Sequence, residues 1–585
     1  MDSDRNLHCD PHEVRTQTDA QGAFALALQA DTPTAQSLVL VLVPASTAMP
    51  AHTLAAPLAA PGVVSPLTTL WSLSMLAQGS SAEAAAQSLR ERGLLAPGSE
   101  PGEHYVATGN HAMMALADAF APAYASAAAR PEGGSALQAA QDAVAAASDI
   151  LVRYMGSAGV LLPTVSAKTV LSEMPLRLGY DTLCYEKAPS VLRIVTEGFA
   201  PVVSKEQYLR ASLALWEQGG ATPLMETGTR IRGRGNSTWE MAKKPYRLNF
   251  DSASSVLGMP SERDWNLLAD YADKSLLRNA MALCLGQRMD MPHTPQYRPV
   301  ELTLNDTYLG VYLITERIEV GENRVPVTEL GAGDDDPEAI TGGYLLEIDG
   351  RLGEDHWFRS WVYDIPITIQ SPNAPTEAQL AYISGYFNAM EEAMLTPEMN
   401  YADYLDVESL VDYYLVNELL RNVDAFRYSG FMYKERGGKL TFGPIWDFDL
   451  AADNALEYVG ARIEGWYLKD SHPWLARFFE DPRFVRHVQA RWAFLKAQLP
   501  YLQSYIDAMA GHYSSSGAQQ RNFAAWPVLH TVVPPARLAL GSHEAEVGYL
   551  KTWLANRAAW MDEAIHTLTP AAATAEPSLA QTGRQ

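Results

Sequence analysis

The sequence predicts an α+β protein of several domains, in which a small β fragment and an α-helical domain precede a larger two-lobed part. Three observations predict this class. A chain of 585 residues is too long for a single hydrophobic core. Alanine-rich helical periodicity covers residues 65–175, whereas strand signals dominate residues 176–340. A mainly helical pattern then returns over residues 341–568, so strands and helices are segregated along the larger part.

The first 175 residues carry signals of fold but no pattern typical of catalysis. Residues 1–46 contain short apolar runs, which predict a fragment resembling a β-sandwich. Residues 47–64 are rich in alanine and proline and predict a linker. The helical domain, residues 65–175, is expected to begin with Ser65 as its N-cap and Pro66 at the first helical position. We expect a spacer, or a domain that docks to a partner or to the cell envelope.

Composition and charge disfavour several classes of protein. The net charge of −24, from 68 acidic and 44 basic residues, disfavours binding to nucleic acid or to an anionic membrane. No apolar run approaches the roughly 20 residues of a membrane helix. The three cysteines, Cys9, Cys184 and Cys284, are odd in number and far apart, so no disulfide framework is predicted. No signal peptide is visible, which by itself predicts a cytoplasmic protein, although the abrupt start leaves room for a leader upstream.

A basic segment lies in the strand-rich region. The sequence predicts two strands, residues 230–235 and 245–250, joined by a turn. Alternating residues share one face of a strand, so three arginines are expected side by side, and two lysines lead into the second strand. These residues are Arg230, Arg232, Arg234, Lys243 and Lys244. Their concentration in an acidic chain indicates a polyphosphate site, and a solvated basic face is the alternative.

An acidic segment follows in the helix-rich region, from residue 406 to residue 453. It predicts a helix, a turn carrying Asp424, a hairpin at Gly437-Gly438, and an apolar strand that ends in Trp-Asp-Phe-Asp. The hairpin would bring Asp424 close to Asp447. Two converging carboxylates in apolar surroundings are what a metal-dependent transfer reaction requires. Residues 569–585, rich in alanine, threonine and proline, are expected to be disordered.

Seven motifs, in order, resemble the spore-coat protein H (CotH) kinase family. The resemblance covers roughly residues 191–568, and residues 1–175 lie outside it. The motifs are RGRGNSTW, KKPYRLNF, DKSLLRNA, LGVYLITERI, GGYLLEID, NVDAF and WDFD. The resemblance implies an atypical two-lobed protein-kinase-like fold. It also implies transfer of the γ-phosphoryl group of ATP to serine or threonine of a protein partner, with Mg²⁺ or Mn²⁺.

The resemblance also assigns roles to residues. Asp424 in NVDAF matches the catalytic aspartate, and Asp447 in WDFD matches the metal-binding aspartate, with Asp449 able to assist. Phosphoryl transfer needs mainly positioning and charge neutralisation, so basic residues are expected on the phosphates. We expect Lys244 first, with Arg232 and Arg234 as further candidates. The strand of residues 345–348 would offer backbone groups to adenine, and Glu347 would mark that hinge.

The chain departs from ordinary protein kinases at several positions. No Gly-x-Gly-x-x-Gly loop precedes the basic strand, and Lys243 and Lys244 compete for the role of the phosphate lysine. Glu301 or Glu316 is the expected acidic partner of that lysine. Ser429 stands where ordinary kinases carry a metal-binding asparagine. The alternative function is therefore an inactive kinase fold that serves as a surface binding protein or adhesin. The family resemblance favours an extracytoplasmic or envelope location.

Overall fold

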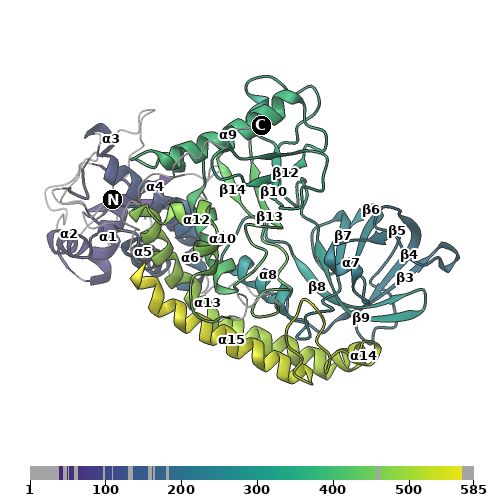
Figure 1. The fold of residues 1–585 in the computed structure, drawn as a ribbon. Helices are drawn as coiled ribbons and strands as arrows, with labels where there is room; N and C mark the ends of the chain where they lie inside the picture. The colour runs from purple at the N-terminus through teal and green to yellow at the C-terminus, as the bar shows by residue number, and fades with distance from the viewer. Residues whose placement is uncertain are drawn as a thin grey trace. The chain divides into compact units, whose positions relative to one another are not determined.

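The computed structural model describes most of the chain, in two compact units, residues 1–182 and 183–585. The described residues are 38–43, 49, 52–57, 63–78, 80–95, 99–103, 105–108, 110–128, 136–155, 161–162, 165–178, 184–455 and 462–568. Helices and strands are mixed, as the predicted α+β class requires (Figure 1). The expected disordered tail, residues 569–585, and most of the expected β fragment lie outside the described residues.

The first unit combines a two-stranded sheet with helices. Strand β1 (Leu38–Val43) pairs antiparallel with β2 (His52–Pro57). The prediction of a linker over residues 47–64 is therefore wrong for residues 52–57, which form β2. This alanine-rich stretch buries Ala55 and Ala56, and the Ala55 amide donates to the Thr69 hydroxyl at 2.9 Å. Small side chains let the strand pack closely against a helix. The same alanine-rich composition is also typical of a linker, so composition alone does not reveal the strand.

The first helix of this unit begins where the capping signal predicts. Helix α1 starts at Pro66, and the Thr68 amide donates to the Ser65 hydroxyl at 3.2 Å, which is the predicted N-cap contact. The described helices of this unit are α1 (Pro66–Gln78), α2 (Ala82–Glu91), α3 (Tyr105–Thr108), α4 (His111–Ala128), α5 (Ala136–Arg153) and α6 (Ala167–Leu178).

The second unit begins with a closed barrel of strands in the order β3-β4-β5-β6-β7-β9-β8. All neighbours are antiparallel except β3 and β8, whose parallel pairing closes the barrel. Its interior holds alternate apolar side chains such as Leu213, Ile231 and Leu248. The strands are β3 (Ser190–Thr196), β4 (Leu209–Trp216), β5 (Met225–Gly233), β6 (Tyr246–Ser254), β7 (Glu262–Leu268), β8 (Tyr297–Leu304) and β9 (Thr307–Glu316).

A five-stranded sheet follows, in the order β11-β12-β10-β13-β14. Its central strand, β10, pairs with β12 on one side and with β13 on the other, so the backbone groups of residues 345–348 are taken up by the sheet. The expectation that this strand offers its backbone to adenine is therefore wrong. The strands are β10 (Tyr344–Ile348), β11 (Trp357–Arg359), β12 (Pro366–Ser371), β13 (Gly430–Lys434) and β14 (Leu440–Phe442).

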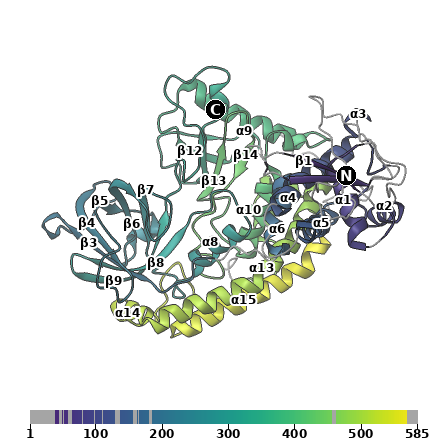
Figure 2. The same ribbon diagram turned by 180° about the vertical axis from the view of Figure 1, so that it is seen from behind.

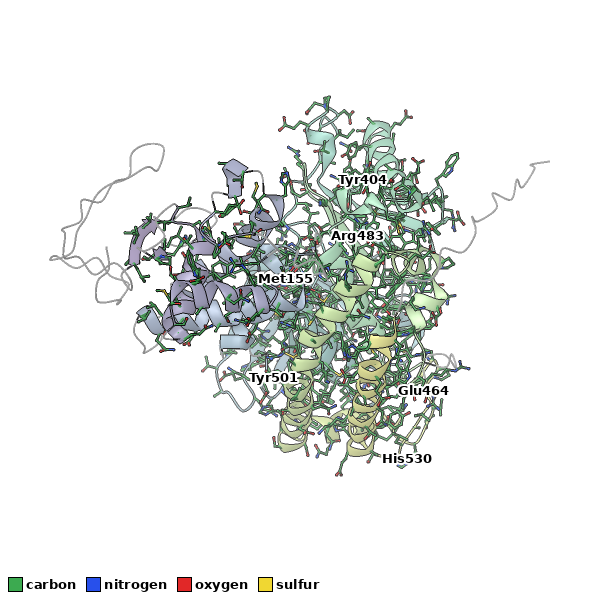
Figure 3. The ribbon with its side chains drawn as sticks, turned by 90° about the vertical axis from the view of Figure 1, so that its left-hand side faces the viewer. Met155, Tyr404, Glu464, Arg483, Tyr501 and His530 are labelled. Carbon is green, nitrogen blue, oxygen red and sulfur yellow. A yellow bond between two sulfur atoms is a disulfide. The ribbon has the colours of Figure 1, made fainter. Side chains whose placement is uncertain are left out.

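Helices complete the second unit. Helix α8 (Arg278–Arg288) comes between β7 and β8 in the chain, α9 (Glu377–Leu395) and α10 (Val407–Leu419) lie by the sheet, and α13 (Pro482–Ser515) is a single helix of 34 residues. Figures 1 and 2 show α13 and α15 (His543–Ala564) running alongside each other, with α14 (Ala518–Ala525) next to β9. Figure 3 labels Arg483 near the start of α13 and Tyr501 past its middle. The remaining helices are α7 (Ser237–Glu240), α11 (Tyr467–Ser471) and α12 (Pro473–Phe478).

Helix α10 is buried along its whole length, because neighbouring helices supply partners for its charged side chains. The Arg491 guanidinium on α13 donates to both carboxylate oxygens of Asp412, at 2.7 and 3.0 Å. Arg557 on α15 pairs with Glu418 at 2.7 Å, and both side chains are fully buried. Glu418 also accepts from the backbone amides of residues 467 and 468. These contacts fix the end of α10, from which the acidic segment continues.

Cys184 and Cys284 form a disulfide, with their Cα atoms 5.5 Å apart. The prediction of no disulfide is therefore wrong. The two residues are 100 positions apart, and only the fold brings the segment before β3 against α8. The Cys184 amide also donates to the Tyr501 hydroxyl at 3.0 Å, which ties the same segment to α13. Within the described ranges, the helices are too short or too polar to cross a lipid bilayer.

Candidate functional site

A cavity of about 370 Å³ lies between the barrel and the five-stranded sheet. The turn between β5 and β6, the segment after β7 and the start of α8 line one side, and β10 and the loops after α10 and β14 line the other. Six of the seven residues predicted from the sequence line it, namely Arg232, Arg234, Glu347, Asp424, Asp447 and Asp449. The lining, within the described part of the chain, includes Lys243 but not Lys244.

Asp424 lies in a turn immediately after α10. Its backbone amide donates to the Asn422 side chain at 3.2 Å, and its carbonyl accepts from the amides of Arg427 and Tyr428 at 3.0 and 2.7 Å. The turn is thus fixed through its backbone on both sides, while the half-buried carboxylate faces the cavity. The sequence prediction of an aspartate on a sharp turn agrees with this geometry.

Asp447 follows β14 but does not end it. The predicted strand stops at Phe442, and the Trp-Asp-Phe-Asp motif lies in a loop. Asp447 has φ of +66°, a conformation that non-glycine residues rarely adopt and that often marks functional sites. The Ser429 hydroxyl donates to the Asp447 carboxylate at 3.1 Å, and the Asn422 amide donates to its carbonyl at 3.3 Å. Asn422 thus contacts both acid-bearing loops.

Asp449 lies in the most acidic part of the cavity. Desolvation raises its pKa well above the ordinary value, and the nearby Asp447, Asp270 and Asp424 raise it further. The Asn454 side chain donates to the Asp449 carbonyl at 2.7 Å, so Asn454 supports the loop. Several carboxylates repel one another here, and a bound cation would relieve that repulsion.

Arg234 is the cation most directly coupled to these acids. It follows the end of β5 and lies over the Trp446 ring at 5.7 Å. Desolvation lowers its pKa, whereas Asp447 and Asp449 raise it. Arg232 has a different environment, because its guanidinium donates to the Lys205 carbonyl and lies over the Tyr208 ring. Arg230 and Arg232 share one face of β5, as predicted, since both lie over the Tyr208 ring. Arg230 bonds Asn249 outside the cavity, so only Arg232 and Arg234 line it.

The two adjacent lysines have opposite surroundings. Lys243 is 2% exposed, lines the cavity, and donates to the Val311 carbonyl and to Asn522 Oδ1, the latter at 3.1 Å. Lys244 instead donates to the Trp239 carbonyl at 2.5 Å. Burial lowers the pKa of Lys243 to about 7, and Asp270 opposes that shift. Of the two candidates, Lys243 is therefore the one placed at the cavity.

Asp270 takes the position expected for an acidic partner of the lysine. Neither expected residue fills that role, since Glu301 pairs with Arg521 at 2.6 Å and Glu316 pairs with Arg324 at 2.8 Å. Desolvation raises the pKa of Asp270 to about 6, and Lys243 opposes this shift. Asp270 has φ of +48°. Sequence analysis missed it because the tripeptide Ala-Asp-Tyr matches no motif.

Asn279 at the start of α8 links the two sides of the cavity. Its side chain donates to Asp270 at 2.9 Å and accepts from the Phe448 amide at 2.9 Å. Its neighbour Arg278 is buried and bonds the carbonyls of residues 451 and 452. These polar residues lie in the DKSLLRNA motif, so the motif supplies contacts to the acidic loop rather than apolar packing alone.

Glu347 lines the cavity through its side chain. Gln370 donates to its carboxylate at 2.7 Å. Desolvation, together with the nearby Asp349 and Asp447, raises the pKa of Glu347 to about 8. Its position in the sheet therefore associates Glu347 with the acidic cluster rather than with an adenine hinge. Two arginines at the cavity are already paired, Arg247 with Asp264 at 3.0 Å and Arg317 with Glu319 at 2.6 Å.

The residues present fit a divalent cation held jointly with a phosphate ligand. Within the described ranges, no group of three or more His, Cys, Asp or Glu side chains forms a complete metal cage. Mg²⁺ is commonly bound by one or two carboxylates together with substrate phosphates and waters. Asp447 and Asp449 supply two carboxylates to a cavity that is also lined by basic side chains. This combination matches the carboxylates and phosphates that commonly bind Mg²⁺.

Comparison with known proteins finds a family model that covers most of the second unit. A family model described as CotH kinase protein matches residues 231–561, which span 331 of the 585 residues. The match begins in β5 and ends in α15, so it includes Arg232, Arg234, Lys243 and the acids of the cavity discussed above. A search of curated proteins found no match.

Proposed function

The chain belongs to the CotH kinase protein family, and on that premise we propose that it is a metal-dependent phosphotransferase. The proposed reaction transfers the γ-phosphoryl group of ATP to a serine or threonine hydroxyl of a protein partner. The observation that carries the proposal is the cavity itself, which Asp424, Asp447 and Asp449 line together with Lys243 and Arg234. Phosphoryl transfer uses carboxylates that bind a metal ion and accept the proton of a hydroxyl group. It also uses basic side chains that bind the phosphates.

The barrel and the helix-rich part would correspond to the two lobes of an atypical kinase-like fold. The cavity between them is lined by residues of both parts. Arg317 and Ile318, where the chain leaves β9, also line it. We therefore assign the nucleotide base to this exit segment, since the backbone of residues 345–348 is occupied by strand pairing.

Asp424 is proposed as the residue that accepts the proton of the acceptor hydroxyl. In the transfer, the hydroxyl oxygen forms a bond to the γ-phosphorus and the bond to the β,γ-bridging oxygen breaks. ADP leaves with that electron pair, and the hydroxyl proton passes to the Asp424 carboxylate. The backbone contacts of the turn hold the residue in place at the cavity, which supports positioning of the acceptor.

Asp447 and Asp449 would hold Mg²⁺ or Mn²⁺. When bound, the cation would neutralise the charge of the phosphates and of the surrounding carboxylates. Ser429 supports Asp447 through its hydroxyl, at the position where ordinary kinases carry an asparagine. Asp449, whose pKa is raised by its neighbours, would become fully ionised as the cation binds.

Lys243 and Arg234 are the cations assigned to the phosphates. Arg232 lines the cavity but already donates to the Lys205 carbonyl, so its contribution would be smaller. Lys244 has no place in this proposal, because the cavity lining in the described part of the chain does not include it, and its ammonium donates to the Trp239 carbonyl. The phosphate-binding lysine is therefore Lys243 in this proposal, instead of the neighbouring Lys244 expected from the sequence.

An oxidising compartment, such as the cell envelope, is the proposed location. Disulfides form and persist mainly outside the reducing cytosol, and Cys184 and Cys284 are joined. Free-thiol titration of the unfolded chain, with and without reductant, tests this. Two thiols that appear only after reduction would agree with the proposal, whereas three thiols in protein purified from its native compartment would contradict it.

Radiolabelled ATP with Mg²⁺ or Mn²⁺ tests the activity. We expect label on the protein itself or on a partner, lost without metal and lost in Asp424→Asn and Asp447→Asn. The alternative is an inactive kinase-fold binding protein, and the observation that favours it is Ser429 in place of asparagine. Calorimetry measures nucleotide affinity alongside transfer and so distinguishes the two functions. Nucleotide binding without transfer would favour that alternative, and no affinity for nucleotide would overturn both assignments of the cavity.

A further inference from the structure

Helix α14 reaches the barrel from the opposite end of the sequence. It follows α13 and lies against β9, as the two opposite views both show (Figures 1 and 2). Arg521 on α14 forms a two-pronged ion pair with Glu301 of β8, at 2.9 and 2.6 Å. The indole of Trp526, one residue beyond the helix, donates to the Leu309 carbonyl at 2.8 Å. The helix is thus held on the barrel through Arg521 near its middle and Trp526 at its C-terminal end.

Asn522 lies between these two anchors and contacts the lysine of the cavity. Its side-chain oxygen accepts from Lys243 Nζ at 3.1 Å and from the Val311 amide at 3.0 Å. The Val311 carbonyl accepts from the same ammonium. Asn522 is 2% exposed. One buried amide therefore joins the lysine side chain, the β9 backbone and a helix from the far end of the chain.

The barrel is shaped to admit this contact. Gly310 has φ of +98°, and a Cβ atom there would come within 2.4 Å of the Asn522 oxygen and 3.3 Å of Lys243 Cε. The pairing of β8 with β9 also shifts register between Leu302 and Thr303, opposite this glycine. A bulge beside a glycine lets another backbone or side chain approach a strand closely.

The geometry points to Asn522 as a positioning residue that orients the Lys243 ammonium toward the phosphates of the bound nucleotide. This inference rests on the proposed function. An ammonium has three N–H donors. Two of them are held on the barrel side by Val311 and Asn522, and the Tyr312 ring lies 4.6 Å from the nitrogen. The third donor is left for the cavity, which Lys243 lines.

Such an arrangement differs from simple capping of a strand. If Asn522 served only to satisfy the Val311 amide, its replacement would affect stability alone. If it orients Lys243, its replacement must change nucleotide affinity, and only while the lysine is present. Residues that act through a shared partner show such non-additive effects.

A double-mutant cycle tests the inference through nucleotide affinity, measured by calorimetry in the full chain. The variants are Asn522→Leu, Lys243→Met and their combination, with Gln520→Leu as the control at an exposed position of the same helix. We expect Asn522→Leu to weaken ADP binding about tenfold, in keeping with loss of a hydrogen bond to a charged group. The same substitution should leave the affinity of the K243M chain unchanged, and Gln520→Leu should leave wild-type affinity unchanged.

Each result has a distinct meaning. Equal weakening by Asn522→Leu in the wild-type and K243M chains would overturn the inference, as would wild-type affinity in Asn522→Leu. A wild-type chain that binds no nucleotide would instead overturn the proposed function. If Asn522→Leu does not fold, Asn522→Ala replaces it, because the smaller side chain removes the acceptor oxygen without adding apolar bulk at the barrel. The cycle is then decided by the same rule: an effect on affinity that disappears in K243M supports the inference, and one that persists contradicts it.

Discussion

The basic segment of residues 230–244 and the acidic segment of residues 424–449 contribute to the cavity in different ways. All three predicted acids, Asp424, Asp447 and Asp449, line the cavity. Of the five predicted cations, three line it, and two of these, Arg232 and Lys243, already donate to backbone carbonyls. Arg230 and Lys244 are used in contacts elsewhere.

The difference follows from side-chain length and from the backbone. A short aspartate can lie only near its own Cα, so a fixed loop determines where its charge is. The loop at Asp447 is fixed by hydrogen bonds from Ser429 and Asn422. Lysine and arginine have long, flexible side chains that reach several carbonyls and aromatic faces. Sequence position therefore locates acids better than cations.

The sharpest test of the acidic segment is Asp424→Asn. The side chain keeps its size but no longer accepts a proton, so we expect phosphoryl transfer to fall by about 10²–10⁴-fold. Nucleotide affinity should stay near the wild-type value, because Asp424 is assigned to the acceptor. Single-turnover transfer from radiolabelled ATP measures the first quantity and calorimetry the second. A large loss of affinity with little loss of rate would place Asp424 on the nucleotide instead.

Support of the acidic segment by α10 can be tested through stability. Glu418 and Arg557 are fully buried partners, and removal of one leaves the other charge buried without its partner. We expect Arg557→Met to lower the free energy of unfolding by about 3–5 kcal/mol, as for other broken buried ion pairs. Urea unfolding followed by tryptophan fluorescence measures the change. Lys496→Met, which breaks an exposed pair with Asp562, is the control and should change it by less than about 1 kcal/mol.

The two adjacent lysines offer a matched test of the basic segment. Lys243→Met should weaken nucleotide binding by about 10–100-fold, the range for hydrogen bonds to a charged group. Lys244→Met should change it by less than about twofold, since that ammonium is held at a carbonyl away from the cavity lining. Calorimetric titration with ADP compares them directly. A larger effect at Lys244 would restore the assignment made from the sequence.

The smallest expected effect is a dependence of nucleotide affinity on pH. Burial lowers the pKa of Lys243 to about 7. The ammonium is charged below that pH and loses its proton above it, so affinity should fall as the pH rises through about 7. Phosphate binding favours the charged form, so we also expect proton uptake on binding above that pH, detectable in buffers of different ionisation enthalpy. In the K243M chain this part of the pH dependence should disappear.

Much of the fold could be predicted from periodicity, capping and turn residues. The start of α1 at Pro66, the hairpin of β8 and β9, and the hairpin of β13 and β14 all follow from local patterns. Features that depend on distant residues could not be predicted. The disulfide of Cys184 with Cys284 is one of these, because three scattered cysteines carry no local signal.

The candidate site shows the same limit. The acids of NVDAF and WDFD can be found through motifs. Asp270 cannot, because only the fold brings its carboxylate close to Lys243 and Asn279. Glu347 was found but given the wrong surroundings, since a local pattern does not reveal that β10 becomes the central strand of a sheet. Asn522 is more than 200 residues from its partner Val311.

Closure of the barrel by β3 and β8 has a consequence for how the protein is made. These parallel strands lie about a hundred residues apart in the chain, Ser190–Thr196 and Tyr297–Leu304. During synthesis, β3 has only β4 to pair with until β8 leaves the ribosome, and one edge of the nascent sheet stays open for that interval. Such long-range pairing is slow to form and leaves strand edges exposed. A ribosome pause before residue 304 would therefore prolong the stage at which the nascent chain is most prone to aggregate.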